Sequence, residues 1–347
     1  MTASDAFAAA QRAAREAYGR LVAVLARDAG DLAAAEDALG DAFERALATW
    51  PRDGVPQVPT AWLLTAARRR LLDQRRHDAV AKRGAQKLLP LLDAAATRGT
   101  DSDRRLDLLF VCAHPAIDRK LRAPLMLQSV LGLTAEQMSA AFAVSPAALG
   151  QRLARAKRRL RKADVPFDVP EGTALDERLG AVLDALYAAF GTGWDDAAGA
   201  RDLRHGLAGE ALYLARLVAA RFAESAEAHG LVALMLFAQS RRDARRDADG
   251  RFVPLSAQDC ALWDSAMIDA ADAHLAHAAS LKQVGRYQLE AAIQAQYARP
   301  PADPEAVALL YEGLVREAPS LASFVGRAAA LGEARGAAAG LAASAAS

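Results

Sequence analysis

The strongest concentration of charge in this 347-residue sequence is a run of cations near its middle. Residues 152–162 hold seven Lys or Arg, and residues 146–162 hold no acid. Lysine and arginine bind phosphate oxygens, and glutamine and arginine also pair with base edges in a DNA groove. A helix that served solubility alone would normally carry Glu between its cations. The run therefore predicts a surface that binds a polyanion, and DNA is the first candidate.

Two capped helices are predicted to present this cationic run. Thr134 and Gln137 form a capping-box pattern for a short helix, and Ser145 followed by Pro146 supplies the cap and first turn of a second helix. Two helices joined by so short a turn are typical of a helix-turn-helix, whose second helix enters the major groove. We therefore predict this motif at residues 134–162.

The second of these helices is expected to have a buried side and a DNA-facing side. Helical spacing predicts a buried stripe of Leu149, Leu153 and Leu160. The residues near its amino-terminal end would lie closest to the bases, and the cations from residue 157 onward suit phosphates. The predicted DNA contacts are Ala147, Ala148, Gln151, Arg152, Arg155, Lys157, Arg158 and Arg159.

Two further charged helices are predicted upstream. Residues 31–50 carry a net charge of −4 and residues 61–87 a net charge of +6, and the loop 51–59 between them holds three prolines and one glycine. An acidic helix beside a basic one indicates two different partners on one domain. The basic helix has an apolar stripe at helical spacing, made of Trp62, Leu63, Ala66, Ala67, Leu71 and Leu72.

The charges divide the chain into two halves near Asp164. Residues 1–163 have a net charge of +10 and residues 164–347 a net charge of −9, although the whole chain has only +1. Two prolines and a glycine at 166–172 punctuate the chain where the cationic run stops. This asymmetry predicts a polyanion-binding half joined to an acidic half.

The composition favours an all-α, globular, cytoplasmic protein without cofactor or metal. Apolar residues make up 53% and aromatic residues only 6%, and no alternating strand pattern is evident. No apolar run is long enough for a membrane span, and the amino terminus does not resemble a signal peptide. Cys112 and Cys260 are too far apart in sequence for a metal knuckle, so both are predicted to be buried thiols. His114 has no second ligand nearby and is interpreted as a helix-end histidine.

The charged segments resemble a known family. DLAAAEDALGDAFERALATW followed by PTAWLLTAARRRLLDQRR resembles region 2 of bacterial RNA polymerase sigma factors of the extracytoplasmic-function group, and LTAEQMSAAFAVSPAALGQRLARAKRRLRK resembles their region 4. The later segments LYAAFGTGWDD and YQLEAAIQAQYA are similar to the subgroup with a large helical, tetratricopeptide-like extension. The resemblance implies region 2 at 1–77, a flexible linker at 78–103, region 4 at 104–163 and an acidic helical extension at 164–347.

The resemblance also implies partners and residue roles. Core RNA polymerase would be bound through its β′ clamp helices and β flap, with Asp31, Glu36, Asp37, Asp41 and Glu44 on the clamp-helix side. The −10 promoter element would be held by Trp62, Arg68, Arg69, Arg75 and Arg76. The helix from Ser145 would read the −35 element, and the extension would regulate activity or bind an accessory regulator.

Two other classes of protein are weighed against this interpretation. A stand-alone dimeric helix-turn-helix regulator with a sensory domain would explain the cationic helix but would leave residues 31–50 without a role. An enzyme is disfavoured because the sequence has no nucleotide-binding glycine motif, metal-ligand cluster or nucleophile–base constellation. Binding to core polymerase in a one-to-one complex would separate a sigma factor from a dimeric regulator.

Overall fold

The computed structural model describes residues 3–81, 104–139, 142–194 and 201–345. Within these ranges every regular element is a helix, apart from one isolated β-bridge between Arg246 and Phe252. The predicted all-α class is confirmed. The chain forms two compact units, Met1–Ala189 and Phe190–Ser347. The predicted linker lies outside the described residues from Lys82 onward, and the functional boundary at residue 164 stays a prediction.

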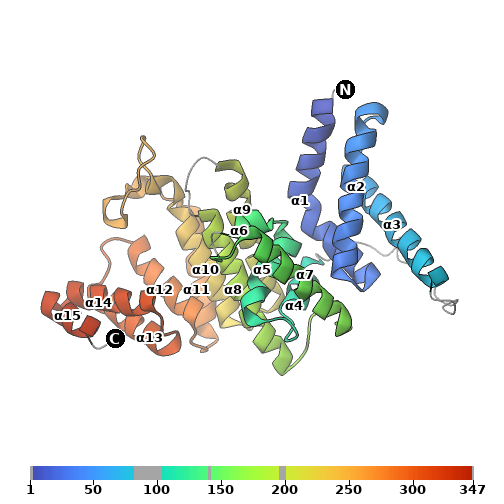
Figure 1. The fold of residues 1–347 in the computed structure, drawn as a ribbon. Helices are drawn as coiled ribbons and strands as arrows, with labels where there is room; N and C mark the ends of the chain where they lie inside the picture. The colour runs from blue at the N-terminus through green and yellow to red at the C-terminus, as the bar shows by residue number, and fades with distance from the viewer. Residues whose placement is uncertain (1–2, 82–103, 140–141, 195–200, 346–347) are drawn as a thin grey trace. The chain divides into compact units, whose positions relative to one another are not determined.

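The first unit contains a bundle of three long helices followed by shorter ones. Helices α1, α2 and α3 pack against one another, and they are the blue elements of Figure 1. The helices of this unit are α1 (Ala3–Ala29), α2 (Leu32–Asp53), α3 (Pro59–Ala81), α4 (Arg105–Cys112), α5 (Arg119–Leu131), α6 (Ala135–Ser139), α7 (Pro146–Lys162) and α8 (Thr173–Trp194), whose last residues belong to the second unit.

The bundle forms because its helices bury small and apolar residues at helical spacing. Asp31 caps α2 by accepting hydrogen bonds from the backbone N–H groups of Ala33 and Ala34. The buried face of α2 consists of Leu32, Ala35, Ala38, Leu39, Ala42, Ala46 and Trp50. The stripe predicted for α3 is confirmed: Leu63, Ala67 and Leu71 are buried, and Trp62, Ala66 and Leu72 are half-buried.

Helices α4, α5 and α7 pack directly onto the bundle, and α6 packs against α7. A Cβ atom at Gly19 of α1 would lie 1.9 Å from the carbonyl oxygen of Val130 in α5, so this close approach of the two helices requires glycine. Cys112 at the end of α4 is fully buried, which raises the pKa of its thiol. Cys260 is exposed, so the prediction of two buried thiols was wrong for this residue.

The predicted caps of α6 and α7 are confirmed. The backbone N–H of Thr134 donates to the Gln137 side chain at 2.8 Å, and the N–H of Gln137 donates to the Thr134 hydroxyl at 3.2 Å. Ser145 accepts from the N–H of Ala148, and Pro146 occupies the first turn of α7. These local bonds fix where α7 begins and therefore which of its side chains face outward.

The second unit is built of helices that each pack against the next helix in the chain, with one long connection. In Figure 1 its later helices run from orange to red. Short 3₁₀ turns interrupt the connection between α10 and α11. The helices are α9 (Arg201–Arg221), α10 (Ala226–Ser240), α11 (Ser265–Ser280), α12 (Arg286–Ala298), α13 (Pro304–Glu317), α14 (Leu321–Arg335) and α15 (Ala337–Ala345).

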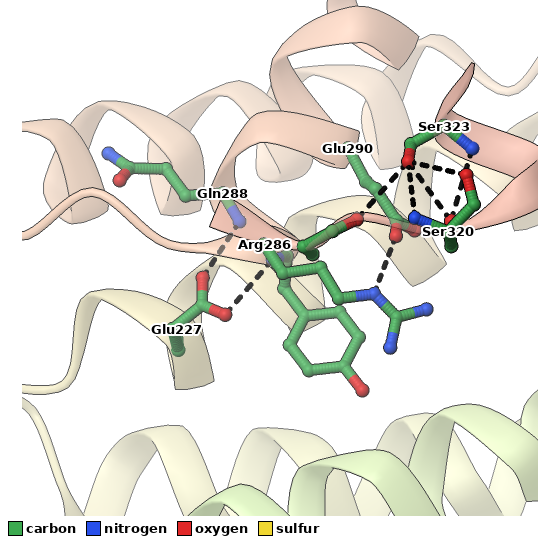
Figure 2. Close-up of polar contacts among 8 residues, drawn as sticks. Glu227, Arg286, Gln288, Glu290, Ser320 and Ser323 are labelled. Atoms are coloured by element: carbon green, nitrogen blue, oxygen red, sulfur yellow. Dashed lines mark hydrogen bonds and ion pairs between the residues drawn. The ribbon is translucent and has the colours of Figure 1, made fainter. Parts of the chain in front are cut away.

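Helix α12 receives its amino-terminal cap from another helix. The carboxylate of Glu227 in α10 accepts the backbone N–H groups of Tyr287 and Gln288, each at 3.0 Å (Figure 2). Gly285, the residue before α12, has no side chain to do this. A Cβ atom at Gly230 would lie 2.5 Å from the backbone nitrogen of Gln288, which shows how closely α10 and α12 approach. Burial raises the pKa of Glu227.

Replacement of Glu227 by alanine is expected to destabilise the second unit. The change leaves two backbone N–H groups of α12 without their acceptor, and a buried donor without a partner costs about 1–3 kcal/mol. We expect the free energy of unfolding, measured by urea denaturation, to fall by about 2 kcal/mol. The exposed residue Glu224 gives the matched control, Glu224→Ala. Equal losses in the two variants would contradict the capping role.

A group of three histidines makes the second unit sensitive to pH. The Nδ1 atoms of His229 and His274 lie 3.0 Å apart, and the rings of His229 and His277 are 4.3 Å apart. Burial, together with the nearby charges of the other two histidines and Arg216, lowers the pKa of His274 to about 4. At neutral pH His229 and His274 are therefore expected to be uncharged.

We expect the second unit to lose stability as the pH falls from about 6.5 towards 4. Because His274 has a pKa near 6.5 when unfolded and about 4 when folded, the unfolded chain binds more protons in this range. The His274→Gln variant should show a flatter dependence of the urea midpoint on pH. His77→Gln, an exposed change in α3, is the control. An unchanged pH dependence in His274→Gln would contradict this assignment.

Candidate nucleic-acid interface

Helix α7 presents an acid-free, cationic face to solvent. The predicted buried stripe is confirmed, since Leu149, Leu153 and Leu160 are each at most 4% exposed. Ala148 is half-buried. The predicted contacts that the structure places on the exposed side are Ala147, Gln151, Arg152, Arg155, Arg158 and Arg159. Arg152, Arg155 and Arg159 follow one another at helical spacing, so they lie along one face and can bind successive phosphates or base edges.

Lys157 lies apart from this cationic face. It is only 8% exposed, and its Nζ atom donates to the carboxylate of Glu36 in α2 and to Gln128 in α5, the latter at 2.7 Å. Ser129 donates a second hydrogen bond to Glu36 at 2.7 Å. In this arrangement Lys157 is not available to DNA. Its position four residues after Leu153 puts it on the buried side of the helix.

A second ion pair joins the same two helices. Arg161 of α7 lies 3.2 Å from the carboxylate of Asp31, which also caps α2. Burial and the charges of Glu36 and Asp37 raise the pKa of Tyr18, whose ring packs in α1 close to these acids. The cationic helix and the acidic helix are therefore bound to each other inside one compact unit.

Three of the five predicted acidic residues of α2 remain at the surface. Asp37, Asp41 and Glu44 are exposed, and their spacing of four and three residues places them on one face of α2. Asp41 forms an ion pair with Arg70 of α3 at 2.5 Å, and both side chains are about half exposed. This exposed acidic stripe suits a partner surface with basic or hydrogen-bond-donating side chains.

Some arginines of α3 bind to other residues of the bundle, and others face solvent. Arg68 pairs with Asp28 at 2.9 Å, and Arg75 donates to the carbonyl oxygens of Asp28 and Ala29 at 2.7 and 2.8 Å, where α1 ends. Arg69 and Arg76 are exposed, and the latter contacts Asp73 of its own helix. Of the four predicted arginines, only Arg69 and Arg76 therefore face outward without a contact to another helix that the structure describes.

The two tryptophans beside the proline-containing loop pack together. Trp50 is buried, and its ring centroid lies 5.5 Å from that of Trp62 in an edge-to-face arrangement. Trp62 is half-buried, so part of its ring is open to a partner. The pair joins the last turns of α2 to the first turn of α3, on either side of this loop.

Sequence reasoning missed the residues that hold these surfaces together. Gln128, Ser129 and Asp28 supply partners from positions distant in the sequence, and no local pattern identified them. Gly19 carried a usable signal, because a glycine within a helix often marks a close approach of another backbone.

Loss of the Lys157 side chain is expected to destabilise the first unit. Glu36 would keep a buried charge without its cation, and breaking a buried pair in this way costs about 3 kcal/mol. Urea denaturation should show this loss for Lys157→Ala, whereas Lys162→Ala at an exposed position of the same helix should change stability by less than about 0.5 kcal/mol. The exchange Glu36→Lys with Lys157→Glu should recover part of the stability. If Lys157→Ala and Lys162→Ala behave alike, the ion pair does not hold α7 to α2.

Neither a metal-binding cluster nor a helix fit to span a membrane occurs in the part of the chain that the structure describes. There, no group of three or more His, Cys, Asp or Glu side chains is arranged to hold a metal ion. No helix in the described ranges is both long and apolar enough to cross a membrane.

The chain is similar to known sequences over most of its length. Residues 13–80 match the family described as Sigma-70 region 2, and residues 178–279 match a family of unknown function, DUF6596. An uncharacterized protein of Rhizobium meliloti (strain 1021) is 38% identical over 320 residues, which cover 89% of this chain and 76% of that protein. No solved structure matches the chain. The region 2 match supports a sigma-70 family factor with a sigma-factor-like role in transcription initiation.

Proposed function

We propose that this chain is an extracytoplasmic-function sigma factor with a regulatory helical extension. It would bind core RNA polymerase and direct initiation at specific promoters by recognising their −10 and −35 elements. The observation that carries the proposal is the acid-free, cationic face of α7, which lies in the same compact unit as the region 2 match. A DNA-reading helix combined with region 2 is what promoter recognition requires.

The exposed acidic stripe of α2 is the proposed contact for the β′ clamp helices. Asp37, Asp41 and Glu44 are open to a partner, whereas Asp31 and Glu36 are paired with α7. In this proposal the first three residues make the initial encounter with polymerase. The other two join the contact once α7 has moved away from α2.

The proposed DNA contacts lie on two helices. In α7, the helix-turn-helix member that would read the −35 element, Gln151, Arg152 and Arg155 are exposed near the amino-terminal end. In α3, Arg69 and the open part of Trp62 are the proposed contacts to the −10 strand, since cations and aromatic rings together hold single-stranded DNA. Region 4 would also meet the β flap.

Simultaneous contact with both promoter elements requires α7 to leave the bundle. The −10 and −35 elements are separated by more DNA than one compact unit spans. The 22 residues 82–103 that follow α3 can span at most about 80 Å, which is ample for this separation. We infer that the pairs of α7 with Asp31 and Glu36 break when the chain binds polymerase and promoter.

The extension is proposed to set the activity of the factor. Its net charge of −9 is opposite in sign to that of the DNA-binding half. If it screens the cationic helices, removal of residues 170–347 should raise the DNA affinity of the free chain at low salt. If it instead contacts polymerase or an accessory regulator, the same truncation should abolish transcription.

Charge reversal on the polymerase surface and charge reversal on the DNA surface should cause two different defects, one in polymerase binding and one in promoter-specific transcription. Asp37→Lys with Glu44→Lys should weaken binding to core polymerase by about tenfold or more, because two favourable charge contacts become repulsive. Arg152→Glu with Arg155→Glu should leave polymerase binding intact and abolish promoter-specific transcripts. Polymerase binding is measured by pull-down with core polymerase. Promoter-specific transcription is measured on DNA upstream of the gene that encodes this chain.

Glu16→Lys, an exposed change on α1, is the matched control and should behave like the unaltered chain. One-to-one binding to core polymerase together with the two separate defects would support the sigma-factor assignment. DNA binding as a dimer with no binding to polymerase would overturn it in favour of a stand-alone regulator.

A further inference from the structure

Three nitrogen-bearing side chains gather between the α4–α5 turn and α8, away from the surfaces described above. They are His114 in the turn, Arg122 in α5 and Arg178 in α8, and all three are half-buried. Burial and the positive charges of Arg178 and Arg122 lower the pKa of His114, and burial and the charge of Arg122 lower the pKa of Arg178. Each group therefore lies within electrostatic reach of the others.

The negative charge near these groups is too small to balance them. The nearest carboxylate oxygen to Arg122 belongs to Glu177, at 3.9 Å, and the Glu177 side chain is 64% exposed to water while that of Arg122 is 11% exposed. Within the described residues, Arg178 forms no ion pair, and its Nε atom is buried without a hydrogen-bond partner. A buried N–H group without a partner is costly and rare in native proteins.

The histidine contributes a third donor with a defined orientation. The Nδ1 atom of His114 accepts the backbone N–H of Ala116 at 3.1 Å, so the neutral ring carries its hydrogen on Nε2. Burial and the two guanidinium charges lower the pKa of His114, so the ring is neutral at pH 7. Nε2 is consequently the hydrogen-bond donor of this ring.

We propose that His114, Arg122 and Arg178 form a binding site for a phosphate group. Guanidinium groups match the spacing of phosphate oxygens, and two of them balance the charge of a dianion. Donors from three separate elements suit a tetrahedral anion better than a planar carboxylate, which one arginine can satisfy. The bound group would supply the partner that Arg178 lacks.

The position of the site gives phosphate a structural effect. Arg122 belongs to the α4–α7 segment, whereas Arg178 belongs to α8 and is the first residue of the DUF6596 match. A phosphate held by both arginines would tie the first helix of the acidic extension to the helices that support α7. The phosphate would come from inorganic phosphate or a small phosphate ester, or from the DNA backbone.

The first test is calorimetric titration of the full chain with inorganic phosphate at constant ionic strength. We expect Arg178→Gln to weaken phosphate binding by about tenfold or more, since it removes charge-assisted hydrogen bonds. Arg178→Lys, which keeps the charge but loses the planar fork, should give an intermediate loss. Arg119→Gln, an exposed change at the start of α5, is the matched control and should bind as the unaltered chain does.

The same variants distinguish free phosphate from DNA as the source of the bound group. They also distinguish phosphate binding from a purely structural role of Arg178. If the DNA backbone supplies the phosphate, neither the unaltered chain nor any variant should bind free phosphate detectably. Arg178→Gln should then reduce the salt dependence of duplex binding by about one counterion. A structural arginine would instead lower the urea midpoint on replacement, whereas the proposal expects Arg178→Gln to keep or raise it. Phosphate affinity and salt dependence both equal to those of Arg119→Gln would overturn the proposal. These measurements use the chain without polymerase, so their outcome is independent of the proposed promoter recognition.

Discussion

The arrangement of the first unit depends on one buried ion pair, between Glu36 of α2 and Lys157 of α7. Removing two charges from water is costly, and the structure compensates with hydrogen bonds from Ser129 to the carboxylate and from Lys157 to Gln128. A hydrophobic pair of similar size would hold two helices at least as firmly. A pair of opposite charges can instead be separated into two hydrated groups, each able to bind a partner of opposite charge.

The pair also separates the charges of the unit into two sets. Charges between α2 and α7 neutralise each other, whereas the cations on the outer face of α7 and the acids at Asp37 and Glu44 remain in solvent. The close contact of Gly19 with the backbone of Val130 fixes α1 against α5, the helix whose Gln128 and Ser129 bond to the buried pair. Helix packing therefore decides which charges bind within the chain and which face outward.

Local patterns predicted the helices and their buried faces well. The caps at Thr134 and Ser145 depend on residues three positions apart, and the stripe of Leu149, Leu153 and Leu160 depends on helical periodicity, so both are written in short stretches of sequence. The exposed Cys260 was wrongly predicted because cysteine is usually buried, yet this one lies in a long connection with little apolar cover.

Long-range pairing was beyond sequence reasoning. Lys157 was grouped with the outward cations, although its place beside the leucine stripe turns it towards Glu36, 121 positions away in the chain. The same limit applies to Arg68 and Arg75, whose partners at the end of α1 are set by how the bundle packs. Sequence patterns therefore predicted which charges the candidate surface carries. Only the fold shows which of these side chains face inward and which face outward.

The cap that α10 supplies to α12 has a consequence for synthesis of the chain. Glu227 is synthesised 60 residues before Tyr287, so its carboxylate stays in solvent until α12 has been made. Throughout that interval the apolar residues of α10 from Leu231 to Phe237, all buried in the finished unit, lack one of the helices that pack against α10. The nascent extension consequently passes through a stage with an open apolar surface, which is the kind of segment that chaperones bind.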